Sequence, residues 1–148
     1  MKNIGLKIAT AEDRAMVIDF DYRLDKFEHK ELGREKKITK AISNNECFII
    51  VADKRAIGFI LFDYRFFGRG WIELIVVDEK HRGEGIGSKA LELICLQSRT
   101  DKVFTSTNQS NTPMQKALSK AGYTYAGEII GLDEGDPELF YFKTKSSI

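Results

Sequence analysis

The sequence predicts an α/β (α+β) fold with a mixed, mostly antiparallel central sheet of about seven strands and about four helices on both faces. The chain has 148 residues, of which 43% are hydrophobic and 30% charged, as expected for one folded domain. Between residues 47 and 77, helical spacing of apolar residues gives way to short apolar runs, which indicate strands. A glycine-rich turn, a helix and another strand follow, in the order of a parallel crossover. We therefore expect a single domain over residues 1–148.

The first third of the chain is expected to contain one strand and two helices. Residues 6–10 alternate in polarity as a strand does, and Thr10 can cap the helix that follows, with Asp13 in its first turn. A second helix is expected near 34–43, after a highly charged connection. The apolar residues that recur at helical spacing in the first helix are Ala15, Ile18 and Tyr22.

The remainder of the chain contains the other strands, together with two further helices. Apolar runs joined by short turns predict an antiparallel meander over 47–52, 56–66 and 71–77. The elements expected after it are a helix near 85–98, a strand at 102–107, a helix near 113–120, and strands at 124–130 and 139–144. Because a helical crossover joins parallel strands, 71–77 and 102–107 should be parallel neighbours.

The charge balance and the cysteines narrow the class of protein. Lys and Arg number 23 and Asp and Glu 22, so no basic field predicts binding to nucleic acid or to an anionic membrane. Cys47 and Cys95 lie in separate apolar runs, and we expect both to be reduced and buried. His29 and His81 are isolated, so no metal site is expected. The absence of a signal-like or membrane-spanning apolar segment makes the cytoplasm the expected location.

Residues 82–88, RGEGIGS, have the features of a phosphate-binding turn. The first N–H groups of a helix have no partner within the helix and, with the helix dipole, they attract anions. Glycine lets a phosphate approach the backbone, and Arg82 adds a permanent cation. The alternative is a glycine-rich turn with one exposed arginine and no ligand.

Two nucleotide-binding motifs come close to this turn and do not fit it. A P-loop counted from Gly83 would reach Ser88, Lys89 and Ala90, which lack the second glycine and the magnesium-binding hydroxyl. The dinucleotide motif G-x-G-x-x-G would need glycine at 88, where the chain has serine. The phosphate is therefore expected to belong to another kind of ligand.

The pattern Arg82-x-x-Gly85-x-Gly87, between LIVV and SKALELI, resembles the acetyl-CoA-binding motif of the GNAT superfamily of N-acetyltransferases. The segment TSTNQSNTPMQKALSKAGY resembles that family's second conserved segment, and the expected element order fits the family along essentially the whole chain. The residues that match this second segment are Asn111, Gly122 and Tyr123. The resemblance implies acetyl-CoA, or coenzyme A, as co-substrate.

The resemblance also implies where the co-substrate binds. The parallel strands 71–77 and 102–107 would splay apart, leaving backbone groups for the pantetheine arm, while the glycine turn would hold the diphosphate. The cofactor-binding residues implied are Ile75, Val76, Val77, Arg82, Gly83, Glu84, Gly85, Ile86, Gly87, Ser88, Asn108 and Asn111. Ile75 and Val77 are equally well explained as core strand residues, and the two asparagines as ordinary turn caps.

The chemistry implied is attack of an amine on a thioester. A lysine-like amine has a pKa of about 10.4, so below about one molecule in a thousand is neutral near pH 7. A general base offsets part of that barrier. Glu73 is the candidate, because it is the only charge in WIELIVV and many relatives carry a carboxylate there. The alternative is an outward-facing strand glutamate without a catalytic role.

One family feature is missing from the second segment. The tyrosine that often protonates the leaving thiolate would lie four residues before Gly122, where this chain has Leu118. Leu118 is expected to be a core residue of a helix that Thr112 caps, with Pro113 as its first residue, and Tyr123 is also assigned to the core. Another group would then donate the proton, or coenzyme A would leave as the thiolate.

Three functions remain open from the sequence. The leading one is an acetyl-CoA-dependent N-acetyltransferase acting on a primary amine of a small molecule, protein or peptide, and a homodimer is compatible with it. The carboxylates of Asp19, Asp21 and Asp25, or the acidic loop 131–139, could receive a cationic acceptor, or could simply be solvated. The alternatives are a non-catalytic acyl-CoA-binding sensor or partner module, and a structural domain without a cofactor.

Overall fold

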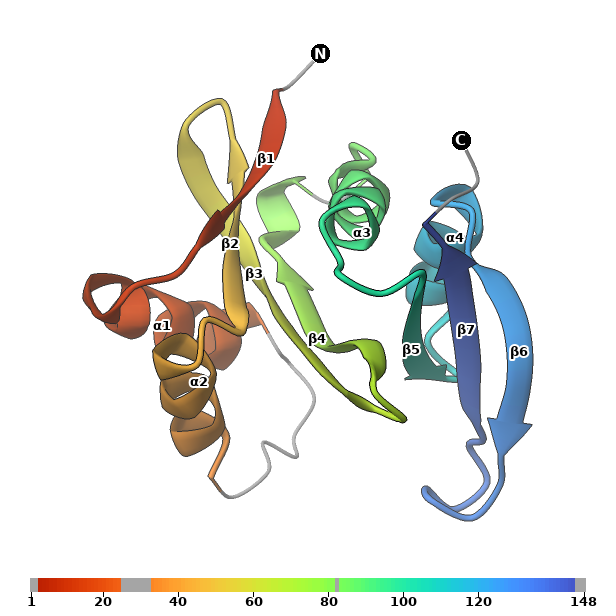
Figure 1. The fold of residues 1–148 in the computed structure, drawn as a ribbon. Coiled ribbons are helices and arrows are strands. Elements are labelled where there is room, and N and C mark those ends of the chain that lie inside the picture. The colour runs from red at the N-terminus through yellow and green to blue at the C-terminus, as the bar shows by residue number, and fades with distance from the viewer. Residues whose placement is uncertain (1–2, 25–32, 82, 146–148) are drawn as a thin grey trace. The chain divides into compact units, whose positions relative to one another are not determined.

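The computed structural model describes residues 3–24, 33–81 and 83–145 (Figure 1). Over these residues a seven-stranded sheet has the order β1-β2-β3-β4-β5-β7-β6. The strands are β1 (Ile4–Ile8), β2 (Cys47–Ala52), β3 (Arg55–Phe66), β4 (Arg69–Val77), β5 (Lys102–Asn108), β6 (Thr124–Ile129) and β7 (Glu138–Thr144). The helices are α1 (Arg14–Leu24), α2 (Arg34–Ser43), α3 (Ile86–Leu96) and α4 (Thr112–Lys120), with short 3-10 turns at Ala11–Asp13 and Glu79–His81.

The pairing of the strands confirms the predicted mixed sheet. β4 pairs with β5 in parallel, with Gly70 opposite Val103 and Ile72 opposite Thr105. The pairs β1–β2, β2–β3, β5–β7 and β7–β6 are antiparallel. The crossover from β4 through α3 to β5 is therefore the parallel unit that the sequence predicted, in a sheet that is otherwise mostly antiparallel.

The chain forms two compact units, the first made of Met1–Phe62 with Leu74–Ile86 and the second of Asp63–Glu73 with Gly87–Ile148. In the first unit, α1 and α2 pack together, and their apolar residues join those of β2 and β3 in one core (Figure 1). Phe59 and Ile38 are completely buried there. Both faces of β2 are buried, which explains its continuous apolar sequence.

The buried face of α1 differs from the predicted stripe. Val17 and Phe20 lie in the core, whereas Tyr22 is 76% exposed and Ile18 is only half-buried. Two apolar stripes are present on this helix, and spacing alone does not distinguish them. The start of the helix is as predicted: the backbone N–H of Thr10 donates to the Asp13 carboxylate at 2.8 Å, and that of Asp13 donates to the Thr10 carbonyl.

Close packing of two strand backbones explains one glycine of β3. A Cβ atom added at Gly58 would lie 2.1 Å from the carbonyl oxygen of Val76 on β4. No side chain fits there, so β3 and β4 approach more closely than any other residue at 58 would allow. This contact fixes the position of the Val76 backbone next to β3. Val76 is 7% exposed and belongs to the core of the first unit.

In the second unit, hydrogen bonds link α3 to α4 and to Tyr123, the residue before β6. The Ser88 hydroxyl donates to the Ala117 carbonyl at 3.1 Å, and the Tyr123 hydroxyl donates to the Leu91 carbonyl at 2.7 Å. Along β5 the side chains alternate, with Val103 and Thr105 buried and the residues between them half-buried. One face of β5 is therefore core, and the other is partly open.

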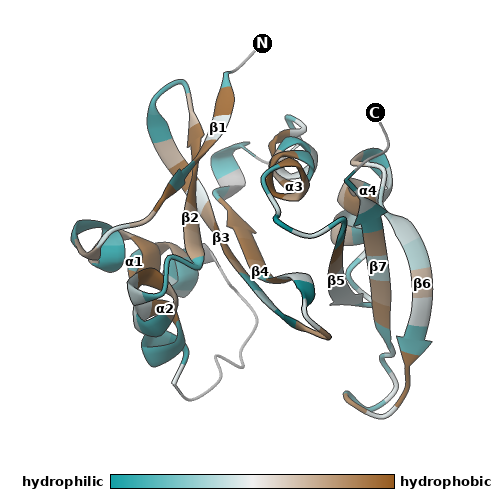
Figure 2. Cartoon of the chain, in the orientation of Figure 1, coloured by the Kyte–Doolittle hydropathy of each residue, from teal (hydrophilic) through white to brown (hydrophobic). Residues whose placement is uncertain are grey.

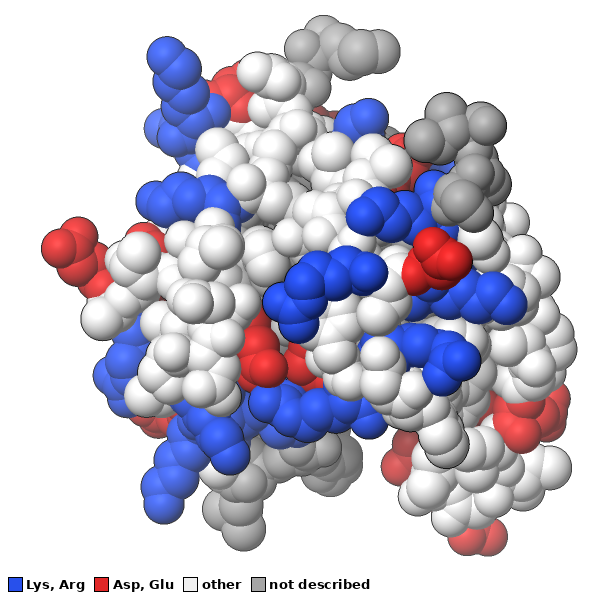
Figure 3. Space-filling view, viewed as in Figure 1, with Lys and Arg blue, Asp and Glu red and all other residues white. Residues whose placement is uncertain are grey.

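Figures 2 and 3 show how apolar and charged residues are distributed over the structure. Lysine and arginine side chains are interspersed with acidic ones over the face drawn in Figure 3. In Figure 2, β4 is hydrophobic along much of its length, while the turn between β2 and β3 is hydrophilic. Among the residues that the structure describes, no helix has the length and apolar character needed to cross a membrane.

Candidate functional site

The turn before α3 has a backbone that requires glycine at two positions. Gly83 has φ +84° and Gly85 has φ +76°, values that side chains other than glycine rarely adopt. Glu84 lies between them, exposed, with a carboxylate oxygen 3.8 Å from Nδ1 of His81. The turn thus reverses the chain and delivers it to the first residue of α3. Arg82, the predicted cation of this turn, lies outside the described residues.

Gly87 is different, because neither its backbone conformation nor any contact among the described residues requires glycine. Gly87 lies in the first turn of α3 and is not among the residues with positive φ. A Cβ atom added there would meet no other atom within 4 Å. Glycine in a helix is less stable than alanine by roughly 0.5–1 kcal/mol. The glycine keeps a space open over the start of the helix, as a bound phosphate requires.

The side chains on either side of Gly87 point into the protein. Ile86 is 1% exposed, and Ser88 is 6% exposed with its hydroxyl bonded to Ala117. At Ile86, Gly87 and Ser88 the outer surface of the helix start is therefore mainly backbone. The N–H groups of a first helical turn have no acceptor within the helix, so this surface suits an anion.

The predicted pantetheine-binding strand is β4. Val76 is buried, and Ile75 and Val77 are half-buried. The parallel pairing of β4 with β5 joins Gly70–Ile72 to Val103–Thr105. Ile75, Val76 and Val77 come later in β4 than the paired residues. Val76 belongs to the core of the first unit, and a role for Ile75 and Val77 in binding would use their backbone groups.

Glu73 is exposed on β4, as a proton acceptor for an external amine must be. The indole Nε1 of Trp71 donates to its carboxylate over 3.4 Å. The structural alternative predicted an outward-facing glutamate, and the catalytic interpretation is also compatible with exposure, so exposure alone does not distinguish them.

The two predicted asparagines have structural roles. The Asn111 side-chain oxygen accepts from the Met114 backbone N–H at 3.2 Å and caps α4, so Thr112 lies in the first turn and is not the cap that the sequence suggested. The Asn108 amide donates to the Asp133 carboxylate at 2.8 Å and holds the loop after β6. Both contacts match the capping alternative, and neither tests contact with a cofactor.

Comparison with known proteins decides the family. The family model described as the acetyltransferase (GNAT) family matches residues 13–123. An acetyltransferase of the GNAT family from Bacillus cereus ATCC 10987 shares 32% identity and a TM-score of 0.83, over 98% of each chain. The chain belongs to the GNAT family of acetyltransferases.

More distant structures share the fold of this GNAT acetyltransferase. One from Streptococcus agalactiae 2603 has 17% identity and a TM-score of 0.81, covering 96% of this chain and 95% of that one. An aminoglycoside acetyltransferase, AAC(6')-Ib, in complex with coenzyme A has 16% identity and a TM-score of 0.77, covering 97% and 95%. None of the curated proteins compared with the chain matches it. The protein is thus an acyltransferase whose family uses acetyl-CoA.

This GNAT acetyltransferase lacks a tyrosine proton donor in its second segment. Leu118 is completely buried in α4, as predicted. Tyr123 is also buried, and burial raises the pKa of its phenol well above the ordinary value. Its hydroxyl donates to the Leu91 carbonyl, which agrees with the predicted assignment of Tyr123 to the core.

The two thiols of the GNAT acetyltransferase are free and buried, as predicted. Burial, with a smaller contribution from Asp13, raises the pKa of Cys47 to about 12. Burial also raises the pKa of Cys95, against the opposing effect of Lys143 and Lys145. Neither thiol has the thiolate character that a nucleophile requires.

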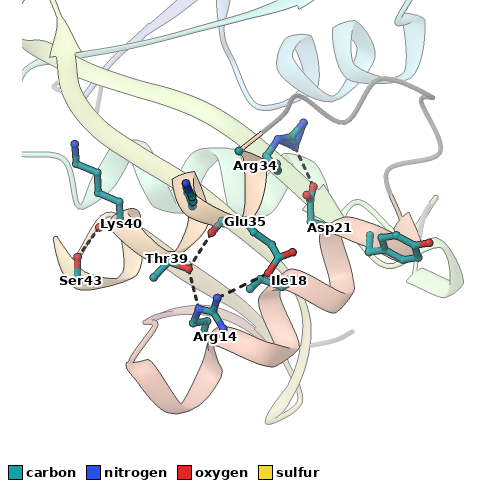
Figure 4. A pocket seen from close by; sticks show the side chains of 11 residues that line it. Arg14, Ile18, Asp21, Arg34, Glu35, Thr39, Lys40 and Ser43 are labelled. Carbon is teal, nitrogen blue, oxygen red and sulfur yellow. Dashed lines mark hydrogen bonds and ion pairs between the residues drawn. The ribbon is translucent and has the colours of Figure 1, made fainter.

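A groove of about 890 Å³ lies between α1 and α2 in the first unit (Figure 4). Its wall is held by Arg14, whose Nε donates to the Thr39 hydroxyl at 2.8 Å and whose Nη2 lies 3.8 Å from the Glu35 carboxylate. The predicted acceptor carboxylate Asp21 is buried and paired with Arg34 at 3.0 Å. These groups bind one another, which weakens the prediction that Asp21 receives a cationic substrate.

Another predicted carboxylate of this region, Asp19, already has a partner. Asp19 accepts from Nε of Arg23 at 2.7 Å, within the same helix. Asp25 lies outside the described residues. The contacts of Asp19 and Asp21 therefore give no support to acceptor binding at these two carboxylates.

A layer of aromatic rings beside Glu73 was missed by the sequence analysis. It consists of Phe66, Trp71, Phe104, Phe140 and Phe142. These residues come from four strands, so no single segment shows them together. The local sequence signals are weak: the pair Phe66-Phe67, of which Phe66 ends β3, and the alternation F-x-F at residues 140–142 in β7.

Proposed function

We propose that the protein moves the acetyl group of acetyl-CoA to a primary amine by direct attack of the amine on the thioester, with residues 1–148 acting as one N-acetyltransferase domain. The family model covers segments of both compact units, which supports one functional domain. The observation that carries the proposal is the open glycine turn, and above all Gly87, where no contact among the described residues requires glycine.

The turn and β4 would hold the co-substrate. Backbone N–H groups from Gly83 to Ser88 would bind the diphosphate, and Arg82 would pair with its oxygens. Backbone groups of Ile75 and Val77 would bind the pantetheine arm, with Val76 anchored in the core by its contact with Gly58. Asn111 and Asn108 are proposed as further contacts to that arm; the Asn111 amide nitrogen is the candidate donor, since the Asn108 amide nitrogen already donates to Asp133 and to the Asp136 carbonyl.

Glu73 is proposed as the base, acting directly or through one water molecule. Acetyl-CoA supplies the acetyl group as an activated thioester. An amine of pKa about 10.4 is disfavoured in its neutral form by roughly 4–5 kcal/mol near pH 7. Glu73 would take a proton from the attacking nitrogen as the new C–N bond forms and the C–S bond breaks. Leu118 has no proton to donate and the Tyr123 hydroxyl is bonded to the Leu91 carbonyl, so either another group would protonate the sulfur or coenzyme A would leave as its thiolate.

The test combines binding with turnover. Isothermal titration should show acetyl-CoA binding, and free-thiol release should follow addition of a primary amine. Glu73→Gln should leave acetyl-CoA affinity within about twofold and lower kcat/KM by roughly 10²- to 10⁴-fold. The buried thiols of Cys47 and Cys95 should not interfere with a thiol-detecting reagent.

The matched control is Glu128→Gln, which changes an exposed glutamate of β6 that accepts from the Tyr125 hydroxyl. That variant should keep full turnover. Full turnover of Glu73→Gln across pH with a good acceptor would remove Glu73 as the base. Acetyl-CoA binding without turnover of any amine would instead favour a non-catalytic acyl-CoA-binding module.

A further inference from the structure

We propose, building on the acetyl transfer proposed above, that the acceptor is a small primary amine that carries an aromatic ring, and that the aromatic layer beside Glu73 binds it. The layer belongs entirely to the second unit. It comprises the five rings of Phe66, Trp71, Phe104, Phe140 and Phe142.

The rings form one continuous surface. Phe66 and Trp71 are stacked at 4.7 Å between centroids with an angle of 16° between planes. Phe140 lies 6.0 Å from Trp71 and 5.9 Å from Phe66, again stacked. Phe104 lies 5.1 Å from Phe66. Such spacings are typical of favourable aromatic contacts, so the rings hold one another in place.

Strand register places the layer on the partly open face of the sheet. Trp71 is opposite Phe104, which is opposite Phe142 on β7. All five rings are half-buried, whereas the residues that alternate with them, such as Val103 and Tyr141, are buried on the other face. Contiguous half-exposed rings are an apolar surface that could still bury area against a ligand.

Charge is distributed unequally along the layer. At one end are two carboxylates: Glu73, bonded to the Trp71 indole, and Glu138, which accepts from the Ser106 hydroxyl at 2.7 Å. At the other end, Nζ of Lys102 lies 5.1 Å from the Phe142 ring centroid. A ligand with one positive charge is attracted to the carboxylate end and repelled from the lysine end.

This polarity determines how an amine would be oriented. Its ammonium group would lie near Glu73, the proposed base, and its ring would stack on Trp71 and Phe140. The reacting nitrogen and the group that takes its proton would then be adjacent. The layer spans β4, β5 and β7, and with strands roughly 4.8 Å apart its width is about 10 Å. That width matches one ring with a short alkyl chain, and is far below a protein interface.

The test uses the single tryptophan of the chain, Trp71, as a direct reporter of occupancy. Fluorescence titration without acetyl-CoA compares 2-phenylethylamine with n-butylamine, which lacks the ring, and with 3-phenylpropionate, which has the opposite charge. We expect 2-phenylethylamine to bind at least about fivefold more tightly than either, since a stacked or cation–π contact contributes on the order of 1 kcal/mol.

The variant Phe140→Leu should remove that preference in binding and in kcat/KM for 2-phenylethylamine, and leave acetyl-CoA affinity unchanged. The control, Tyr125→Leu, removes an exposed aromatic ring that contacts Tyr141 on the opposite face of the sheet. It should retain the preference. Thermal unfolding of both variants should give Tm values close to that of the unchanged protein.

Three results would overturn the proposal. One is equal affinity for the three probes. Another is an unchanged preference in Phe140→Leu. The third is sedimentation showing that the protein forms a dimer that Phe140→Leu dissociates, because the layer would then be a subunit interface. Failure of acetyl-CoA to bind would instead refute the proposed acetyl transfer, and the fluorescence titration would still report on the layer.

Discussion

Replacing Gly87 by alanine separates a ligand-binding turn from a structural one. The residue has no positive φ, and the added methyl group would meet no protein atom within 4 Å. Alanine should therefore stabilise α3, by roughly 0.5–1 kcal/mol, which raises Tm by about 1–3 °C for a chain of this size. Gly83 and Gly85 are unsuitable for this test, because their positive φ would add strain.

The same methyl group should weaken the binding of acetyl-CoA. It would occupy the space over the first N–H groups of α3 and hold a diphosphate away from the backbone. Loss of one hydrogen bond to a charged group is worth roughly 1.5–3 kcal/mol, so the acetyl-CoA Kd should rise by about tenfold to a hundredfold. Stability and affinity are thus expected to change in opposite directions.

Thermal unfolding and isothermal titration with acetyl-CoA measure the two effects. Gly5→Ala is the matched control, because Gly5 on β1 also has open space at its Cβ position and lies outside the turn. It should leave acetyl-CoA affinity unchanged. An acetyl-CoA Kd for Gly87→Ala within about twofold of the starting protein would refute the phosphate-binding interpretation, and a parallel loss of stability would identify a structural turn.

Three further predictions follow from buried contacts. Gly58→Ala should destabilise the fold by roughly 1–3 kcal/mol or more, since the new Cβ would be 2.1 Å from the Val76 carbonyl oxygen; an unchanged Tm would contradict this packing. Burial raises the pKa of Cys47 from near 9 to about 12 in the folded protein, so above pH 9 the thiol ionises more readily in the unfolded chain. The free energy of unfolding should therefore fall by up to about 1.4 kcal/mol per pH unit between pH 9 and 12 because of this one group. Chemical denaturation of Cys47→Ala should show a less steep loss of stability over that pH range than the unchanged protein. Tyr123→Phe should lower stability by about 1 kcal/mol through loss of the bond to Leu91, with kcat unchanged; a tenfold fall in kcat at equal stability would give Tyr123 a role in catalysis.

Much of the fold could be predicted because its signals are local. Hydrophobic spacing and turn residues located each strand and helix to within a few residues, and the crossover rule predicted that β4 and β5 are parallel. Local signals failed where the sequence contains two apolar stripes with similar spacing. On α1, both Val17 with Phe20 and Ile18 with Tyr22 form apolar stripes, and packing against β2 and β3 selected the first pair.

The candidate site, too, could be predicted from the sequence only in part. Residues 82–88 are contiguous, so the sequence itself could indicate an anion-binding turn and the family that uses it. Tertiary contacts decided the roles of isolated polar residues. Asn111 caps α4, and Asn108 holds Asp133, partners that no spacing in the sequence reveals.

The sequence by itself determined the donor side of this protein: the glycine turn, the strand before it and the membership of an acetyltransferase family. These depend on short segments whose backbone conformation is set by neighbouring residues. Only the tertiary structure decided that Phe66, Trp71, Phe104 and Phe140 form one layer next to Glu73. The physical reason is that strand pairing brings together residues as far as 74 positions apart in the chain, from Phe66 to Phe140, and register is set by the packing of the whole sheet.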